Sequence, residues 1–591
     1  MAGLLRIGLI ARFLRPYRRR IARGVATLVA VNLLGVLIPL LVRQAIDSLQ
    51  PGFVVYDLMR QSLVLIVLAT VMGGIRLVSR ILVFGVGRQV EFNLRQQLFE
   101  HLLRQEPAWL HEMRSGEVIS RSTYDVENVR RLLGFALLSL ANTALVYGLQ
   151  LPAMLSISGS LTLATVSVYP LMLAMVRLFS DRIMRQQRQL QERQAALSDL
   201  IQEDLNGISA IKIYCQEARE NAAFARLNKA YRNAALALAR TRSTLFPLLQ
   251  GISSVSLLVL LALGARQLEA PGAAGSGLTV GGFVALVLYT ERLVFPTALL
   301  GFTLNSFQTG QVSLERIEEL LAREPRIADP ATPQERPRRC SGRIEARNFT
   351  YRYPNAVRPA LSGVSFSIEP GELVAIVGPV GCGKSTLSRA LGRSIDIGPG
   401  QLFIDRQDIT QLRLDDLRSR LALVPQDSFL FTASLADNLR YGVPAAERAA
   451  VVAASHAARL SSDVEGFPDG LDTLVGERGI TLSGGQRQRT ALGRALMMEA
   501  PLLVLDDALA SVDNATASRI LRTITDQGQR TVLFISHQLS AAAICDRVLV
   551  LEDGRLVQSG HHDDLIQQPG TYRRLWERQQ VEAHLQQPSW A

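Results

Sequence analysis

The sequence has little lysine and little charge for its length. Three of its 64 basic residues are lysines, Lys212, Lys229 and Lys384, and the others are arginines. Charged residues make up 20% of the 591 residues, against 48% apolar ones. A chain of this length is too long for one domain. The low charge fits a chain that is part membrane protein and part soluble protein better than a wholly soluble one.

Cysteine is also scarce. The four cysteines, Cys215, Cys340, Cys382 and Cys545, have no metal-binding spacing, and none lies in a segment that we place on the outer side of a membrane. We therefore expect a reduced protein without disulfides. No cleavable signal peptide is expected either, because the first apolar stretch has full membrane length.

Charge is absent altogether from some long stretches. No charged residue occurs from Leu132 to Val176, a stretch of 45 residues. That is too long for one membrane-spanning helix, and Pro152 and Gly159 allow a tight turn within it. Together with the other apolar stretches, this predicts six membrane spans, at residues 24–44, 61–87, 132–152, 157–177, 243–265 and 278–303.

Positive charge is distributed unevenly. The whole surplus of +12 lies in residues 1–325, since residues 326–591 hold 30 basic and 30 acidic side chains. The arginines flank apolar stretches, so the positive-inside rule explains them, and no nucleic-acid partner is expected. Residues 5–23, with seven arginines and no acid, predict an interfacial helix on the cytoplasmic face. We expect a multi-pass protein of the inner (cytoplasmic) membrane with both ends in the cytoplasm.

Two long segments between the spans, residues 88–131 and 177–242, are charged and helical in period. They predict membrane helices that continue into the cytoplasm and turn back at Glu106-Pro107 and Asn206-Gly207; a soluble coiled-coil linker is the alternative. Further along, prolines mark a linker, and strands then alternate with helices. The predicted organisation is an α-helical membrane domain at 1–325, a linker at 326–343 and an α/β domain at 344–591.

A phosphate-binding loop is the most informative motif. It follows the apolar run Leu373–Val377 and precedes a predicted helix, which is the context that the motif requires. Its glycines let backbone N–H groups face phosphate oxygens. Lys384 is expected to reach the β- and γ-phosphates and Ser385 to hold Mg²⁺. The residues that would contact the nucleotide here are Gly378, Pro379, Val380, Gly381, Cys382, Gly383, Lys384, Ser385 and Thr386.

Further motifs narrow the class of nucleotide-binding protein. Asp506 ends the apolar run Leu502–Asp506, which predicts a carboxylate directed at Mg²⁺. Twenty residues before it stands Leu482-Ser483-Gly484-Gly485-Gln486. With this pentapeptide the chain resembles the ATP-binding cassette (ABC) family, over essentially its whole length.

The resemblance implies a set of site residues. Tyr353 would stack on adenine, Gln426 would sense the γ-phosphate and Mg²⁺, and His537 would be the switch histidine. Ser483, Gly484, Gly485 and Gln486 would cover the ATP of a partner chain. Other segments resemble the family's X-loop (Val475–Gly479), D-loop (Ala510–Asp513, with Asp513 at the nucleotide) and two coupling-helix regions (Arg114–Val126 and Gly207–Lys212).

The layout resembles a half-transporter of the type IV exporters, so a second half-transporter chain is the expected partner. One residue departs from the family pattern. Asp507 stands where the family has a glutamate that polarises the attacking water. Its side chain is one methylene shorter, and a badly placed general base costs about 10²–10⁴ in rate. In this the chain resembles the degenerate-site subunit of heterodimeric bacterial exporters. A homodimer with Asp507 as a slow base is the alternative.

The substrate pathway is less defined. Arg76, Arg80, Glu291 and Arg292 lie within or near predicted spans, so they either face a cavity or extend to the membrane surface. The expected activity is ATP-driven export of a hydrophobic or amphiphilic small molecule or lipid, with ATP and Mg²⁺ bound. The alternatives are a homodimeric lipid flippase, a siderophore importer with an exporter-like fold, and a membrane-anchored regulatory ATPase that transports nothing.

Overall fold

The structure is a computed structural model. It describes residues 8–586 except Leu9, 50–54, Arg114, 270–277, 336–339, Asn355, 477–478, 480–481, Asp513 and 527–529. The chain forms two compact units. The first comprises Met1–Leu103 and Arg114–Arg323, and the second comprises Arg104–Met113 and Glu324–Ala591.

The first unit is helical. In the described part of the chain, six helical runs are long and apolar enough to cross a membrane, which confirms the predicted six-helix membrane domain. The elements of these runs are the 3₁₀ turn η1 (Arg15–Tyr17), α2 (Arg18–Asp47), α3 (Val55–Arg104), α5 (Ser115–Ser120), the π-helical turn η2 (Arg121–Asp125), α6 (Val126–Arg131), the π-helical turn η3 (Leu132–Ala136), α7 (Leu137–Ile157), α8 (Gly159–Val166), α9 (Tyr169–Asn206), α11 (Glu217–Glu269) and α12 (Val280–Leu321).

The turn between the third and fourth runs differs from the expectation. Pro152 lies inside α7, and the chain turns six residues later at Ser158. Ser158 has an extended backbone, and its side chain accepts a hydrogen bond from Leu161 N at 3.5 Å. Ser158, which caps the next helix, therefore marks the end of α7. Pro152 does not end α7, because proline within a membrane helix is tolerated when neighbouring groups satisfy the freed carbonyl.

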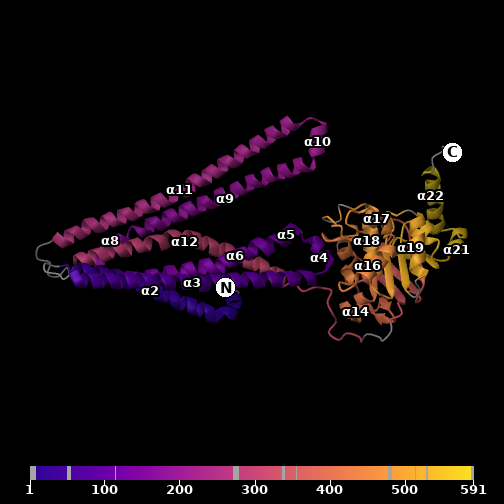
Figure 1. Ribbon diagram of the computed structural model, residues 1–591, viewed down its shortest axis with the longest axis horizontal. Coiled ribbons are helices and arrows are strands. Elements are labelled where there is room, and N and C mark those ends of the chain that lie inside the picture. The colour runs from indigo at the N-terminus through magenta and orange to yellow at the C-terminus, as the bar shows by residue number, and fades with distance from the viewer. Residues whose placement is uncertain are drawn as a thin grey trace. The chain divides into compact units, whose positions relative to one another are not determined.

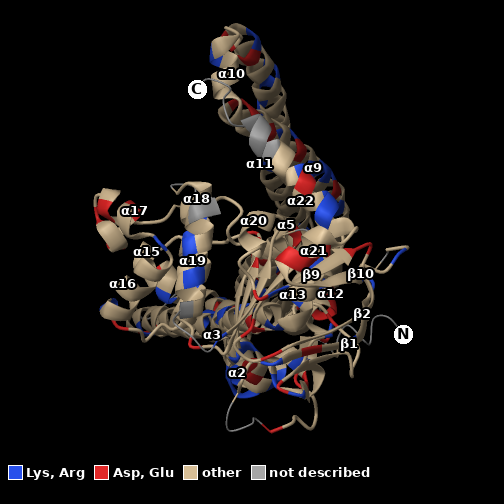
Figure 2. Cartoon of the chain, turned by 90° about the vertical axis from the view of Figure 1, so that its right-hand side faces the viewer, with Lys and Arg blue, Asp and Glu red and all other residues tan. Residues whose placement is uncertain are grey.

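Short helices mark the two turns that were predicted at the ends of the long helical segments. The helix α10 (Ile208–Ile213) joins α9 to α11, which pack side by side (Figure 1). Its counterpart is α4 (Pro107–Glu112), which begins with proline, a residue favoured in a first helical turn. The turn predicted at Glu106-Pro107 coincides with this helix, whereas the first coupling-helix region suggested by the resemblance begins at Arg114, which is outside the described residues, and continues into α5. Basic and acidic residues gather around α10 (Figure 2).

The core of the first unit is built around α12, which packs against α2, α7, α9 and α11. Leu286, Tyr289 and Leu293 of α12 are completely buried. The hydroxyl of Tyr289 donates a hydrogen bond to Val36 O of α2 at 2.6 Å. Tyr169 of α9 donates to Thr290 O of α12 at 2.8 Å. These two bonds satisfy buried phenols in an apolar setting, where an unpaired hydroxyl would be costly.

The second unit contains two sheets, as its predicted α/β character requires. One is antiparallel, in the order β2 (Leu361–Ile368), β1 (Ile344–Tyr351), β4 (Leu402–Ile404) and β5 (Gln407–Asp408). The other has the order β10 (Arg555–Gly560), β9 (Arg547–Glu552), β3 (Leu373–Val377), β8 (Thr531–Ile535), β7 (Leu502–Asp506) and β6 (Leu421–Val424). All its neighbouring strands pair in parallel except β10 with β9.

Every residue of β3, β7 and β8 is buried. Strands covered on both faces are uniformly apolar, which is why these runs show no alternation in the sequence. The described helices of this unit are α13 (Lys384–Leu391), α14 (Leu414–Ser419), α15 (Leu435–Leu439), α16 (Arg448–Ala457), α17 (Ser461–Gly466), α18 (Gly484–Leu496), α19 (Asn514–Asp526), α20 (Leu539–Ala542), α21 (His562–Gln567) and α22 (Thr571–Gln586), with 3₁₀ turns at 409–411, 440–442 and 470–472.

Candidate nucleotide-binding site

The candidate site lies where three parallel strands end. The phosphate-binding loop follows β3, Asp506 and Asp507 end and follow β7, and His537 follows β8. Since β7, β8 and β3 are neighbours in that order, their carboxyl ends meet at one edge of the sheet. Ligands bind at this edge in α/β proteins. The sheet order thus brings together motifs that are up to 159 residues apart in the sequence.

The loop has the conformation that its glycines permit. Gly383 has a φ of 100° and precedes α13. A Cβ atom there would lie 2.4 Å from Ala360 O, so any larger residue would clash. The ammonium of Lys384 donates hydrogen bonds to Gly378 O at 2.8 Å and Pro379 O at 3.0 Å. The lysine therefore folds back over the loop, where the phosphates of a nucleotide are expected.

Asp506 is held by two hydroxyl groups from α13. Ser385 Oγ donates to Asp506 Oδ1 at 3.0 Å, and Ser388 Oγ donates to Oδ2 at 2.6 Å. Asp506 is only 4% exposed. Burial raises the pKa of its carboxyl group, and the two serine hydroxyls oppose that rise. Sequence reasoning missed Ser388, although its spacing of three from Ser385 places both serines on one helix face.

The arrangement fits a magnesium ion. Mg²⁺ prefers oxygen ligands and is held by one or two carboxylates together with substrate phosphates and water. Ser385 and Asp506 supply a hydroxyl and a carboxylate side by side. Among the residues that the structure describes, no group of three or more His, Cys, Asp or Glu side chains could hold a metal ion by itself. Gln426, the third expected metal ligand, is exposed beyond β6, and the hydrogen bonds of Ser385 and Asp506 do not include it.

Asp507 and His537 form the second pair of the site. Asp507 has a φ of 50°, a left-handed conformation that aspartate tolerates better than most residues. Its backbone N donates to Ile535 O at 2.9 Å. Its Oδ1 lies 2.8 Å from Nδ1 of His537, with the Asp507 side chain 16% and the His537 side chain 53% exposed. The expected base and the expected switch histidine are therefore in direct contact.

Tyr353 lies near the helix that follows the loop. Its hydroxyl is 3.3 Å from Oγ1 of Thr386, and its ring meets that of Tyr351 edge to face with centroids 5.0 Å apart. The ring is half-buried. This places an aromatic face beside the loop, as expected for a residue that stacks on a base.

The signature pentapeptide begins α18. Ser483 caps this helix: its Oγ accepts from Gln486 N at 3.2 Å, and Gln486 Oε1 accepts from Ser483 N at 2.9 Å. Ser483 and Gly484 are exposed. Ser511 packs so closely that a Cβ on Gly485 would lie 3.0 Å from Ser511 O. Reciprocal capping therefore orders the start of α18 while its surface stays open.

A residue not foreseen from the sequence joins α18 to the catalytic region. Gln488 accepts from Ser511 N at 2.9 Å and donates to Asp507 O at 3.4 Å. Gln426, Gln488 and Ser511 line one cavity of about 320 Å³. Asp513, and Glu477 and Arg478 of the X-loop, are outside the described residues.

The first unit has a cavity of its own. It measures about 570 Å³, and its lining includes Arg76, Arg80, Glu291 and Arg292. The alternative that these residues face a cavity therefore describes them better than extension to the membrane surface. Arg292 donates to Gly35 O and lies 3.5 Å from Met72 Sδ. None of the three arginines has a carboxylate partner among the described residues.

Comparisons with known proteins agree with both units. Residues 21–297 match the family model described as "ABC transporter transmembrane region", and residues 361–510 match the one described as "ABC transporter". The chain is 33% identical over 585 residues to the "Multidrug resistance-like ATP-binding protein MdlA" of Escherichia coli, covering 97% of this chain and 96% of that protein.

Another relative is the "ATP-dependent lipid A-core flippase" of Thiobacillus denitrificans, with 32% identity over 578 residues, 96% of this chain and 97% of that protein. Among solved structures, a bacterial Atm1-family ABC exporter with ATP bound matches with a TM-score of 0.77 and 28% identity. That match covers 95% of this chain and 99% of the exporter.

Proposed function

Because the chain belongs to the ABC transporter family, as an ATPase of the exporter type that couples hydrolysis to transport, we propose that it is one half of a heterodimeric exporter. It moves hydrophobic or amphiphilic compounds, drugs or lipids, out of the cytoplasm. The transporter lies in the inner (cytoplasmic) membrane, with its nucleotide-binding units in the cytoplasm. The site formed by Asp507 hydrolyses ATP slowly.

The residues around the loop give each part of ATP a binding group. Lys384, poised over the loop carbonyls of Gly378 and Pro379, binds the β- and γ-phosphates, and Tyr353 supports the adenine. When bound, Mg²⁺ is held by Ser385 and Asp506 and offsets the charge of the phosphates. A single chain supplies all of these groups, so this chain binds ATP without a contribution from its partner.

The start of α18 serves the partner's ATP. Ser483 and Gly484 are exposed at a helix N-terminus, where backbone N–H groups attract phosphate oxygens. In an exporter of this family, two chains enclose two nucleotides, each between one chain's loop and the other's signature. An intact Leu482–Gln486 beside an altered Asp507 therefore gives one competent and one slow site in a heterodimer.

The contact between Asp507 and His537 carries the proposal of a slow site. The aspartate is one methylene shorter than glutamate, and its Oδ1 is already bonded to His537 at 2.8 Å. The shorter side chain keeps the carboxylate farther from the attacking water than a glutamate would be, and the contact with His537 holds it in that position. A general base out of position lowers the rate by about 10²–10⁴, which is enough to make the partner's site carry nearly all turnover.

A homodimeric lipid flippase is the second candidate. Two observations favour it: the flippase similar to this chain over 96% of its length, and the cavity that holds Arg76, Arg80 and Arg292. Arginines without carboxylate partners at membrane depth attract acidic groups, as an amphiphile with an anionic head would supply. In a homodimer, the same Asp507 would have to support all hydrolysis.

The substitution Asp507→Glu distinguishes the two candidates. We expect it to raise steady-state ATPase activity of the lone chain by at least about tenfold, and to add a second active site when a candidate partner chain is present. Lys384→Ala is the matched control, because it removes nucleotide binding in either state. Full activity of the unaltered lone chain, with no gain from Asp507→Glu, would instead establish the homodimer.

A further inference from the structure

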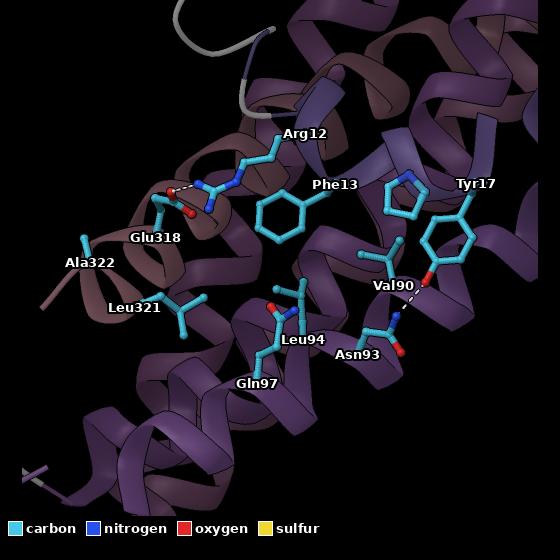
Figure 3. A pocket seen from close by; sticks show the side chains of 11 residues that line it. Arg12, Phe13, Tyr17, Val90, Asn93, Leu94, Gln97, Glu318, Leu321 and Ala322 are labelled. Carbon is cyan, nitrogen blue, oxygen red and sulfur yellow. Dashed lines mark hydrogen bonds and ion pairs between the residues drawn. The ribbon is translucent and has the colours of Figure 1, made fainter. Parts of the chain in front are cut away.

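A cavity lies between the N-terminal helix and two long helices of the first unit (Figure 3). It measures about 430 Å³. Phe13 and Tyr17 line it from the N-terminal segment, Leu94 from α3 and Glu318 from α12. Three parts of the chain that are far apart in sequence therefore enclose one space.

The floor of this cavity is apolar and its rim is polar. Val90 and Leu94 of α3 are 2% and 1% exposed, so they are packed from below. At one side of the rim, Arg12 pairs with Glu318 at 2.7 Å. At another, Asn93 donates to the Tyr17 hydroxyl at 2.6 Å, as the dashed lines in Figure 3 show. These two contacts attach the N-terminal helix to α12 and to α3.

A second cavity adjoins the first, since Pro16 and Tyr17 line both. It measures about 520 Å³, and its other lining residues are Arg18, Arg19, Arg20 and Gln89. All three arginines are exposed and have no carboxylate partner in the described part of the chain. Three adjacent positive charges thus face a space with no acidic side chain in its lining.

The position of these arginines along the helices places them at the cytoplasmic surface of the membrane. The charge-free part of α2 begins at Gly24, four residues after Arg20, and the span predicted in α3, at residues 61–87, ends just before Arg88, the neighbour of Gln89. Four residues of helix span about 6 Å. The second cavity therefore lies at the level of lipid phosphates, where a basic cluster next to a membrane helix attracts anionic lipids.

We infer that the second cavity is a binding site for the phosphate-bearing head of an anionic phospholipid of the inner leaflet. Arg18, Arg19 and Arg20 bind the phosphate, and Gln89 and Tyr17 offer further hydrogen bonds. The head extends past Tyr17 toward the first cavity. If these arginines only faced solvent and bound no ligand, neither the cavity beside them nor the Tyr17–Asn93 contact would be needed.

Occupation of the site has a structural consequence within the first unit. A lipid bound between Arg18–Arg20 and Gln89 joins the start of α2 to α3. The same junction carries the N-terminal helix, which Arg12 attaches to Glu318 near the end of α12. The lipid therefore stabilises the packing of three helices at the point where they leave the membrane. This role is separate from that of the cavity lined by Arg76, Arg80 and Arg292.

Lipid titration of the purified full-length chain, followed by native mass spectrometry, tests the site. The probes are phosphatidylglycerol, phosphatidylcholine and inorganic phosphate. The triple substitution Arg18→Gln, Arg19→Gln, Arg20→Gln is expected to weaken phosphatidylglycerol binding on the order of 100-fold, since each basic residue near the surface contributes about a fivefold attraction. Phosphatidylcholine binding should not change. Replacing the same three arginines by lysine should retain binding, which guards against a variant that merely misfolds.

The matched control removes three arginines from another helix. Arg182, Arg185 and Arg188 of α9 are exposed, follow a charge-free stretch and line neither cavity. An equal loss of phosphatidylglycerol binding in this control would overturn the proposal, because any surface charge would then suffice. Inorganic phosphate that competes as well as the lipid would show a free phosphate site. Loss of binding on Arg76→Gln and Arg80→Gln, but not on the triple substitution, would overturn the proposal by placing the lipid in the cavity that Arg76 and Arg80 line.

Discussion

Nδ1 of His537 lies 2.8 Å from Oδ1 of Asp507, so the residues that follow two neighbouring strands meet side chain to side chain. The contact bridges β8 and β7 at the edge where the phosphate-binding loop begins. It is formed within one chain. The Asp507 carboxylate is therefore oriented by an imidazole of its own chain.

His537→Ala should reduce the hydrolysis that this site still performs. Without the imidazole, the Asp507 side chain loses its orienting partner, and we expect a fall of about 10–100-fold in single-turnover hydrolysis by the lone chain. Nucleotide affinity should stay within about twofold, because Lys384 and the loop are untouched. His537→Gln, which keeps a hydrogen-bond donor, should recover part of the rate. A fall in affinity equal to the fall in rate would show that His537 acts in binding instead.

Ser388→Ala should weaken the magnesium site without removing any direct ligand. The substitution takes away the 2.6 Å hydrogen bond to Asp506 Oδ2, and partners that orient a metal ligand are worth about 10–100-fold in affinity. The measurement is the Mg²⁺ concentration that half-saturates nucleotide binding. Ser419→Ala is the control, since that exposed hydroxyl donates only to Asp416 O. An unchanged magnesium dependence would mean that Ser385 alone positions Asp506.

Asp506→Asn should stabilise the nucleotide-free protein at neutral pH. Burial raises the pKa of Asp506 above its unfolded value, so the native state binds the proton more tightly and its stability falls as pH rises through the carboxyl range. Asparagine carries no ionisable proton, so the variant does not lose this stability as pH rises. The unfolding midpoint of the variant should exceed that of the unaltered chain by about 2–4 °C for each kcal/mol gained, at pH 7 but not near pH 4.

With Mg²⁺ and ATP present, the unaltered chain should have the higher unfolding midpoint and Asp506→Asn the lower one. They stabilise the unaltered chain by binding its folded state, whereas Asp506→Asn lacks the charged oxygen ligand. A variant that is less stable than the unaltered chain at pH 7 in the absence of both would contradict the assignment of Asp506 as a buried, costly carboxylate.

Cys382 should react slowly with alkylating reagents although it lies in the phosphate-binding loop. Its side chain is 4% exposed, and burial raises the pKa of its thiol. Cys215 is exposed. Because the thiolate is the reactive form, we expect iodoacetamide to modify Cys215 at least about tenfold faster at pH 7.5. Peptide mass spectrometry over time measures both rates in one sample. Equal rates would show that the loop opens readily without nucleotide.

The sequence predicts well what depends on local pattern. The long apolar stretches correspond to six helical runs long and apolar enough to span a membrane, because a charged side chain is costly in lipid. The loop, Asp506 and the start of α18 follow from motifs whose spacing is set by strand and helix lengths. The family resemblance added Tyr353 and His537, which no local pattern would have singled out.

What the sequence does not predict depends on packing between distant segments. The contacts of Ser388 with Asp506 and of Gln488 with Ser511 arise only when α13 and α18 pack against the ends of strands. The π-helical turns at Arg121–Asp125 and Leu132–Ala136 have no recognisable residue pattern. The turn at α4 could be predicted even though polar helical sequence surrounds it on both sides, because Glu106-Pro107 marks its start.

The end of the α9–α11 hairpin at α10 carries exposed apolar side chains among charged residues. Ile213 is 75% and Tyr214 72% exposed there, and a patch of this kind on a solitary protein invites capture by chaperones or proteases. Copies of this chain that find no second half-transporter would accordingly be removed. Assembly, rather than synthesis alone, would then set how much of the protein accumulates.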